Sequence, residues 1–196
     1  MITSLLLSPG IPMLLMGDEC SRSQGGNNNA WCQDNPIGWM LWDQSSYDND
    51  LNNYIKFLLK LRDSLPEFFS PEVSFEESIY INQRNKTHFS LEWHGIKLKD
   101  PDWSDWSHTI SYSINKSPEE AVIWIGLNAY TKAMKFELPK SDSKWVKLID
   151  TRDSILSVDK PKPSILSNQS HIELENRSTV VIIAMEYFNR IQPNLN

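Results

Sequence analysis

Apolar positions divide the 196-residue chain into a helical first third and a strand-rich remainder. The first eight residues are apolar enough for the end of a buried helix, which a Pro-Gly pair stops. Residues 11–16 are continuously apolar, which is typical of a strand in a parallel sheet that helices cover. From residue 50 to 64, apolar side chains recur at the three-or-four spacing of one helical face, which predicts a helix ended by Pro66.

After Pro66 the apolar period changes from helical to alternating, as expected for strands with one buried face. The pattern predicts eight strands, over 79–82, 87–93, 109–114, 121–128, 133–138, 144–150, 171–175 and 179–185. Turn residues between these strands favour an antiparallel β-sandwich. Residues 66–72 would form a hinge, residues 153–170 a long surface loop, and the chain after Phe188 would fray.

Composition and charge narrow the class of protein and of partner. Hydrophobic residues make up 40% of the chain, and eight Trp can fill a sizeable core. The formal charge is −6 and the basic residues are scattered, which argues against nucleic acid as a partner. The longest apolar stretch, residues 2–16, is broken by two prolines and a glycine, falls short of a membrane span and lacks the basic lead of a secretion signal. A soluble chain that is neither exported nor in a membrane is expected.

The cysteines and histidines predict no metal site. Cys20 and Cys32 lie in one loop twelve positions apart, and without a secretory context we expect free thiols. No Cys spacing or His cluster suggests zinc, and no phosphate-binding or dinucleotide-binding glycine pattern occurs. No cofactor is therefore expected. The four His all fall in the strand-rich part, where we expect strand or loop roles rather than catalysis.

A loop of about thirty residues, 20–49, follows the apolar run and is longer than an ordinary connection, so we expect it to face a ligand. Asp18 and Glu19 stand at its start. Successive strand residues point to opposite faces, so these two carboxylates cannot act as an acid and nucleophile pair on one bond. A buried Glu19 would need a charged partner, for which Arg22 is the nearest candidate, and the pair could equally be a purely structural ion pair.

The loop is dense in neutral hydrogen-bonding groups of the kind that recognise sugars: Gln24, Asn27, Asn28, Asn29, Gln33, Asp34 and Asn35. The alternative is that these side chains bond the backbone of the loop itself, as Asn does in turns, and the sequence does not separate the two. Three indoles, Trp31, Trp39 and Trp42, could stack on pyranose rings. We favour core packing for Trp39 and Trp42.

Two blocks of sequence resemble one family. GIPMLLMGDE at 10–19, GNNNAWCQDN at 26–35 and WMLWD at 39–43 are similar to the eighth barrel strand and following loop of isoamylases and glycogen-debranching enzymes. These enzymes belong to the α-amylase superfamily, glycoside hydrolase family 13. The block EWHGIKLKDPDWSD at 92–105, together with Ser107 and His108, resembles their C-terminal β domain. The chain departs from the family at Trp31, where Tyr is frequent, and at Trp106, where an acidic residue is common.

The resemblance implies a fold of the α/β plus all-β class. Residues 1–65 would be the last strand and helices of a (β/α)8 barrel, and residues 66–196 an antiparallel β-sandwich domain. A single barrel strand leaves its edges unpaired, so the first part should be marginal alone, whereas the β domain should hold together.

The resemblance also implies a parent enzyme that hydrolyses α-1,6 branch linkages of glycogen or a starch-like glucan. Such enzymes use an Asp nucleophile and a Glu acid/base from earlier barrel strands, and no such pair can be assembled here. We therefore expect no catalytic residue in this chain and no activity from it alone. The missing barrel would come from the parent chain or from a separate polypeptide. A location in the cytoplasm, or in a plastid of a photosynthetic eukaryote, is expected.

The residues expected to contact the branched glucan are Glu19, Arg22, Asn27, Asn28, Asn29 and Asp34. Two alternatives remain open at this point. One is a non-catalytic carbohydrate-binding or regulatory fragment, and the other is a truncated product that binds nothing.

Overall fold

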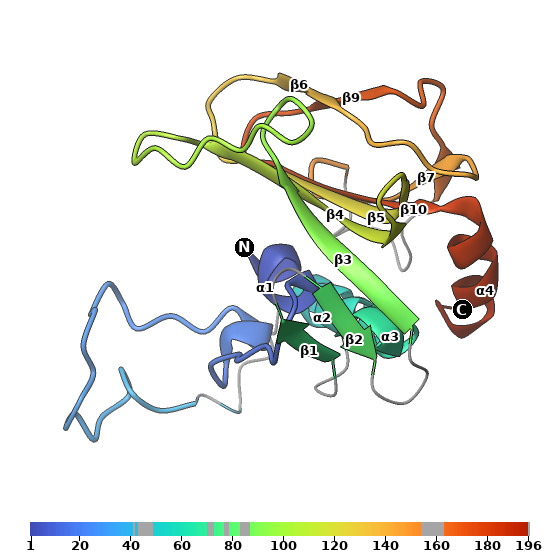
Figure 1. Ribbon diagram of the computed structural model, residues 1–196. Coiled ribbons are helices and arrows are strands. Elements are labelled where there is room, and N and C mark those ends of the chain that lie inside the picture. The colour runs from blue at the N-terminus through green and yellow to red at the C-terminus, as the bar shows by residue number, and fades with distance from the viewer. Residues whose placement is uncertain are drawn as a thin grey trace.

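The computed structural model describes residues 1–40, 42, 49–69, 73–76, 79–82, 87–153 and 163–195. Its centre is an eight-stranded antiparallel sheet in the order β1-β2-β3-β4-β5-β10-β7-β8, and a separate two-stranded sheet pairs β6 with β9 (Figure 1). The strands are β1 (Val73–Glu76), β2 (Ile79–Asn82), β3 (Thr87–His94), β4 (Thr109–Ser117), β5 (Glu120–Asn128), β6 (Met134–Glu137), β7 (Trp145–Asp150), β8 (Ser164–Ile165), β9 (His171–Leu174) and β10 (Ser178–Ala184).

All eight predicted strands are confirmed, with ends that differ by three residues at most. The antiparallel pairing is confirmed as well, with registers such as Val181 opposite Ile125 and Trp93 opposite Tyr112. The pattern missed β1, which has four residues, and β8, which has two. A two-residue strand is too short to show a period. The predicted hinge and the loop at 153–170 lie partly outside the described residues.

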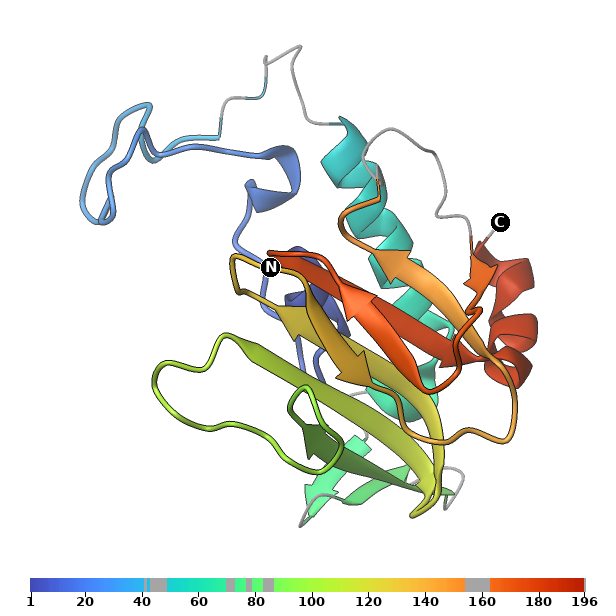
Figure 2. The ribbon, with the colours of Figure 1, turned by 90° about the horizontal axis from the view of Figure 1, so that it is seen from above.

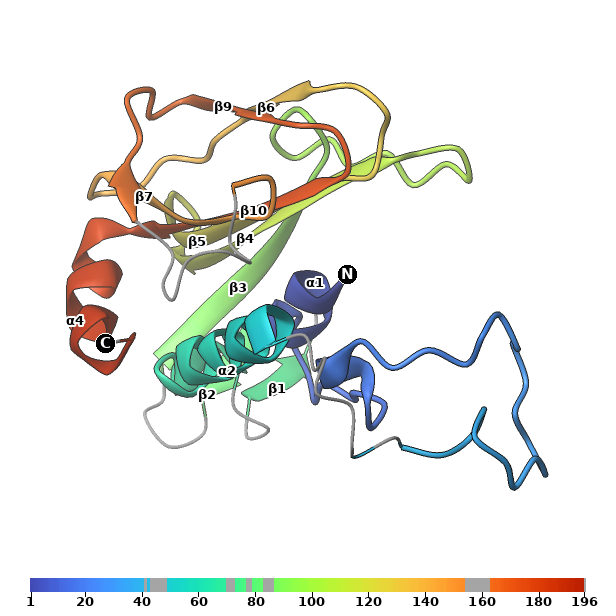
Figure 3. The ribbon, with the colours of Figure 1, turned by 180° about the vertical axis from the view of Figure 1, so that it is seen from behind.

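Both faces of the large sheet are covered. Figures 2 and 3 show β6 and β9 over one face and the helices α1 (Ile2–Leu7), α2 (Asn49–Asp63) and α3 (Pro66–Phe69) under the other. All seven residues of β10 are buried, and successive residues alternate between the two layers: Val180 and Ile182 pack with β6 and β9, Val181 and Ile183 with the helices. A continuous apolar run is therefore found here in an antiparallel strand, because both of its faces are covered.

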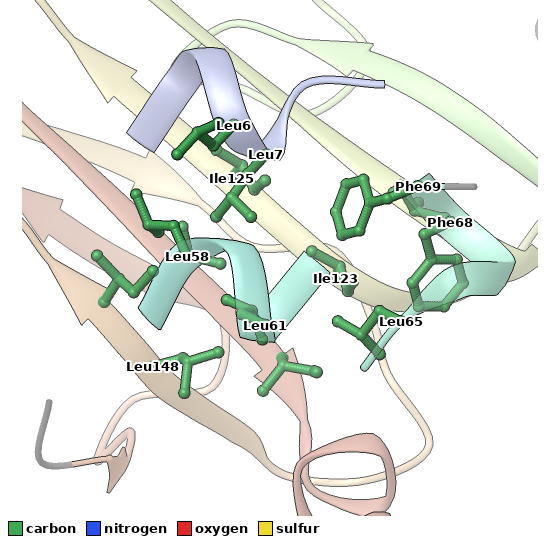
Figure 4. Close-up of a cluster of buried hydrophobic side chains, with 14 of the residues drawn as sticks. Leu6, Leu7, Leu58, Leu61, Leu65, Phe68, Phe69, Ile123, Ile125 and Leu148 are labelled. Carbon is green, nitrogen blue, oxygen red and sulfur yellow. The ribbon is translucent and has the colours of Figure 1, made fainter. Parts of the chain in front are cut away.

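The helices contribute to the same hydrophobic cluster as the sheet. Leu6 and Leu7 of α1 and Leu58 and Leu61 of α2 pack with β5 and β7 side chains, as Figure 4 shows around Ile125. The helix predicted over 50–64 is confirmed as α2, and the helical start of the chain as α1. The cluster thus draws residues from both sides of the predicted boundary at 65/66, and the division into two domains stays a prediction.

Two predictions of local structure are wrong. Residues 11–15 belong to no strand, and Ile11, Met13, Leu15 and Met16 are between 59% and 87% exposed. A strand requires a neighbour to pair its backbone groups, and the described residues place none beside this segment. The frayed end predicted after Phe188 is instead the end of α4 (Met185–Leu195), an amphipathic helix that buries Ile191. No helix among the described residues is long and apolar enough to span a bilayer.

Arg62 of α2 ties the first ten residues to the rest of the core. Its side chain is only 8% exposed and donates to the carbonyl oxygens of Leu6 at 2.8 Å, Ser8 at 2.9 Å and Phe69 at 2.9 Å, and also to Gly10. The guanidinium also lies 5.1 Å from the centre of the Phe69 ring. Burial lowers the Arg62 pKa, yet a guanidinium stays charged, so these carbonyls receive charge-assisted bonds.

Two buried tyrosines reinforce the same junction. The Tyr112 hydroxyl of β4 donates to Leu7 O at 3.0 Å, and Tyr54 of α2 shares a 2.7 Å hydrogen bond with Thr3. Burial raises the pKa of both phenols, that of Tyr54 to about 12, so they remain neutral donors. Helix α1 is therefore held near its start by Tyr54 of α2 and at its end by Tyr112 of the sheet.

His94 holds the loop between β3 and β4. The ring is fully buried, accepts the Lys99 N–H at Nδ1 over 3.0 Å and lies 2.9 Å from the Ser113 hydroxyl at Nε2. Gly95 next to it has no room for a side chain, because an added Cβ would lie 2.3 Å from the Asp100 carbonyl oxygen. The expectation that His94 has a strand or loop role is confirmed.

Replacing Arg62 tests how much the junction depends on it. Arg62→Ala leaves four carbonyl oxygens without their donor, so we expect the free energy of unfolding to fall by about 3 kcal/mol. Arg152→Ala, which removes an exposed side chain, should change it by less than about 0.5 kcal/mol. Urea unfolding of the intact chain measures both values, and equal losses would contradict the role of Arg62.

The burial of His94 predicts that the free energy of unfolding falls at acid pH. Burial is the largest influence on its pKa and lowers it from 6.5, with Lys99 adding to this effect and Glu92 opposing it. The unfolded chain therefore binds more protons, so the contribution is complete above pH 6.5 and is lost as pH falls through the folded-state pKa. We expect the free energy of unfolding to fall below pH 6.5, and to fall less steeply in His94→Gln, which cannot titrate. Parallel curves of unfolding free energy against pH would show that His94 does not cause this fall.

Candidate functional site

The candidate site begins where the exposed apolar segment ends. Gly17 has a φ of 99°, and an added Cβ would lie 2.7 Å from Cδ of Arg22, so the turn requires glycine. A single 3-10 turn, η1 (Asp18–Cys20), follows. The Glu19 carboxylate accepts the Gly17 N–H at 2.7 Å, and Asp18 is exposed. The turn is closed by its own acidic side chain.

Glu19 and Arg22 do not form the ion pair considered above within the part of the chain described. Arg22 packs against Gly17 and donates from Nη1 to the Gly38 carbonyl oxygen at 3.2 Å. Its Nε is buried and has no hydrogen-bond partner among the described residues. Arg22 therefore links the start of the loop to residue 38, sixteen positions later, and Glu19 remains with the backbone of its turn.

Asn27 and Asn29 shape the middle of the loop. The Asn27 side chain donates to the Gln33 side-chain oxygen at 3.0 Å and accepts the Asn29 N–H at 2.9 Å. Asn29 in turn accepts the Trp31 N–H at 3.2 Å, while Gln33 donates back to the Asn29 carbonyl at 3.0 Å. These are turn-type bonds of the loop to itself, and they occupy acceptors that a ligand would otherwise meet.

Asn28 differs from its two neighbours. Its side chain is exposed, and no hydrogen bond from it is found within the described residues. Both polar groups of its amide are therefore open to a ligand in the described structure, whereas Asn29 has only its side-chain NH2 group open. The structure brings Asn27 to Gln33 and leaves Asn28 at the surface.

Asp34 positions an indole. Its carboxylate accepts the Trp39 ring N–H at 2.7 Å, and Trp39 is 50% exposed. Trp31 and Trp42 are more exposed still, at 82% and 72%. The prediction that Trp39 and Trp42 pack in the core is therefore wrong, because no described part of the molecule covers the loop. The faces of Trp31 and Trp39 are available for stacking.

Further exposed rings lie outside this loop. Trp103 and Trp106, between β3 and β4, are 64% and 78% exposed, and Trp103 meets Trp93 edge to face at 5.5 Å. Neither indole is among the residues that the sequence predicts to contact glucan. Their setting, DPDWSDWSH, carried a usable signal, because polar neighbours on both sides place a Trp away from a core.

The chemistry available at the loop is binding chemistry. Cys20 and Cys32 are free thiols, as predicted. Burial, and to a lesser extent the nearby Glu19 carboxylate, raises the pKa of Cys20. No group of three His, Cys, Asp or Glu that could hold a metal occurs in the part described. Amides, one oriented carboxylate and exposed indoles can bind a neutral polyhydroxylated ligand by hydrogen bonds and stacking.

Comparison with known proteins finds one matching family and several similar proteins. The family described as "Isoamylase 1-3, C-terminal" matches residues 92–183. Isoamylase 1, chloroplastic, of Arabidopsis thaliana is 31% identical over 150 residues, which are 76% of this chain and 18% of that protein. The glycogen debranching enzyme of Pectobacterium atrosepticum is 33% identical over 141 residues, covering 71% of this chain and 19% of that enzyme.

A shorter match has a higher identity. The glycogen debranching enzyme of an Enterobacter species is 50% identical over 66 residues, which are 34% of this chain and 10% of that enzyme. The chain thus spans less than a quarter of the length of these relatives.

Solved pullulanases share the fold. Pullulanase type I from Bacillus subtilis superposes with a TM-score of 0.60 at 21% identity, over 93% of this chain and 22% of that one. Pullulanase from an Anoxybacillus species gives a TM-score of 0.58 at 19% identity, with the same coverage. The family match and the named relatives together show that residues 92–183 are an isoamylase-type C-terminal domain.

Proposed function

We propose that this chain is the C-terminal part of a hydrolase that cleaves α-1,6-glucosidic branch linkages of glycogen or a starch-like glucan. The family match at residues 92–183 and relatives named as glycogen debranching enzymes support this function. The loop chemistry supports it as well, because neutral amides and exposed indoles suit a neutral sugar chain better than an ion.

One observation carries the proposal of a barrel. Ile11, Met13, Leu15 and Met16 expose large apolar side chains, although Arg62 fixes the chain at Gly10 just before them. An anchored apolar segment of this kind is suited to lie between further strands and helices. Residues 1–65 would then be the last part of a (β/α)8 barrel, in which residues 11–16 pair as a strand only when neighbouring barrel strands lie beside them, and residues 66–196 the C-terminal β domain.

The six residues expected to contact glucan would have different tasks. Glu19, Arg22 and Asn27 make the internal bonds of the loop, so their part in binding would be to shape it. Asn29 shares this task through Trp31. Asn28 would meet sugar hydroxyls directly, and Asp34 would hold the indole to which it is bonded.

The isolated chain is expected to hydrolyse no branched glucan, because the two carboxylates that glycoside hydrolysis needs cannot be assembled from its residues. Incubation of the pure chain with glycogen, followed by a reducing-end assay, measures this. The Pectobacterium debranching enzyme serves as the positive control. Release of linear chains at a rate that scales with the amount of pure protein would refute the prediction.

The loop proposal is tested with Asn28. Asn28→Ala should weaken retention of the chain in a glycogen-containing native gel several-fold and leave the melting temperature unchanged, because the side chain is exposed. Asn194→Ala removes an exposed amide from α4, far along the sequence from the loop, and should leave retention unchanged. Equal retention of Asn28→Ala and the unaltered chain would exclude Asn28 from glucan binding.

A further inference from the structure

A groove runs beside the turn between β4 and β5, in the β domain and apart from the loop at residues 17–40. Two clefts, of about 280 Å³ and 520 Å³, adjoin there and share Glu119, Glu120 and Lys140. The first cleft extends to Glu92 and Asn115, and the second to three serines, Trp145 and Gln169. The larger cleft falls in the range of small-molecule sites, about 300–1,000 Å³, and the smaller lies just below it.

Hydrogen bonds fix the walls of this groove. The Ala121 N–H of β5 donates to the Lys140 carbonyl at 3.0 Å, and the Trp145 indole donates to the Pro139 carbonyl at 3.1 Å. The Trp145 N–H also donates to the Gln169 side chain at 2.6 Å. A concave surface held by such bonds keeps its shape without a ligand, which lowers the entropic cost of binding.

The charges around the groove largely neutralise one another. Glu92 pairs with Lys99 at 3.2 Å, and Glu120 pairs with Lys116 at 3.3 Å. Glu119, Asp142 and Lys140 also line the groove, so charges of both signs are interspersed with hydroxyl and amide groups. Such a mixed set can donate to and accept from the hydroxyls of a neutral sugar.

Two polar atoms in the walls have no partner among the described residues. Asn115 is 4% exposed, its amide nitrogen is 3.5 Å from Glu92, and its carbonyl oxygen is unbonded. The Ser143 hydroxyl, in the wall of the second cleft, is also buried and unbonded. Leaving a buried acceptor without a donor costs about 1–3 kcal/mol, so a ligand hydroxyl that reaches Asn115 would be favoured.

We propose that this groove is a second glucan-binding site, which holds a linear α-linked segment of the polymer away from the loop at residues 17–40. The inference rests on the proposed function for its choice of sugar. Hydroxyls of the glucan donate to Asn115 and Ser143, and the Lys140 ammonium donates to hydroxyl or ring oxygens. The site performs no chemistry and keeps the enzyme attached to its polymer.

Titration of the ¹⁵N-labelled intact chain with maltoheptaose tests the proposal by NMR. We expect amide shifts to move at Glu119, Lys140 and Ser143, with cellohexaose as the comparison sugar. Movement with both sugars identifies a general saccharide groove and overturns the α-linked assignment. Movement confined to residues 27–29 overturns the groove while leaving the proposed function intact. Movement at neither place overturns the groove and also counts against the loop site.

Variants separate the groove from nonspecific effects. Lys140→Ala should weaken maltoheptaose binding at least fivefold, because Lys140 lines both clefts. Lys132→Ala, the matched removal of another exposed lysine, should stay within twofold of the unaltered chain. Asn115→Ala should weaken maltoheptaose binding more than Lys140→Ala does. If Asn115→Ala fails to fold, the comparison of Lys140→Ala with Lys132→Ala still tests the proposal. Equal dissociation constants for Lys140→Ala and Lys132→Ala would overturn the proposal.

Discussion

The packing of the helices on the sheet depends on one buried cation. Arg62 donates to four carbonyl oxygens, three from residues 6–10 and one from Phe69, and the bonds to Leu6 and Phe69 are buried. These carbonyls end α1 and begin the exposed apolar segment, so without a donor they would be costly to bury. The same guanidinium therefore stabilises a helix end, joins α1 to α2 and α3, and sets where the apolar segment starts.

The sheet explains why that junction is needed. Its central strands are buried on both faces, by β6 and β9 on one side and by the helices on the other. A β domain alone would expose Ile123, Ile125 and Val181 to water, at a cost of about 1.5–3 kcal/mol for each large apolar side chain. The helical first part thus completes the core of the sheet. Through this shared core, the position of the loop at residues 17–40 is tied to that of the sheet.

The loop shows how a polar sequence can serve structure and binding together. Asn27, Asn29 and Asp34 use their polar groups to fold the loop, and the result is an ordered presentation of Asn28, Trp31 and Trp39. The two interpretations left open by the sequence are therefore compatible, because bonds within the loop fix the groups that face outward. The exposed indoles carry the apolar area that a sugar ring or a neighbouring part of the protein would cover.

The sequence by itself determined α2 and eight strands, because the spacing of apolar residues within each segment, such as Leu58 and Leu61 or Val180 to Ile183, indicates the element. It also determined the family through its motifs. The tertiary structure alone decided that residues 11–15 form no strand, since pairing depends on a neighbour that no local pattern specifies. It likewise decided which Trp are exposed, how Arg62 gathers carbonyls from two helices, and that Asn115 and Lys140 line one groove. Those outcomes depend on which distant segments meet, whereas periodicity reports only which face of a segment is apolar.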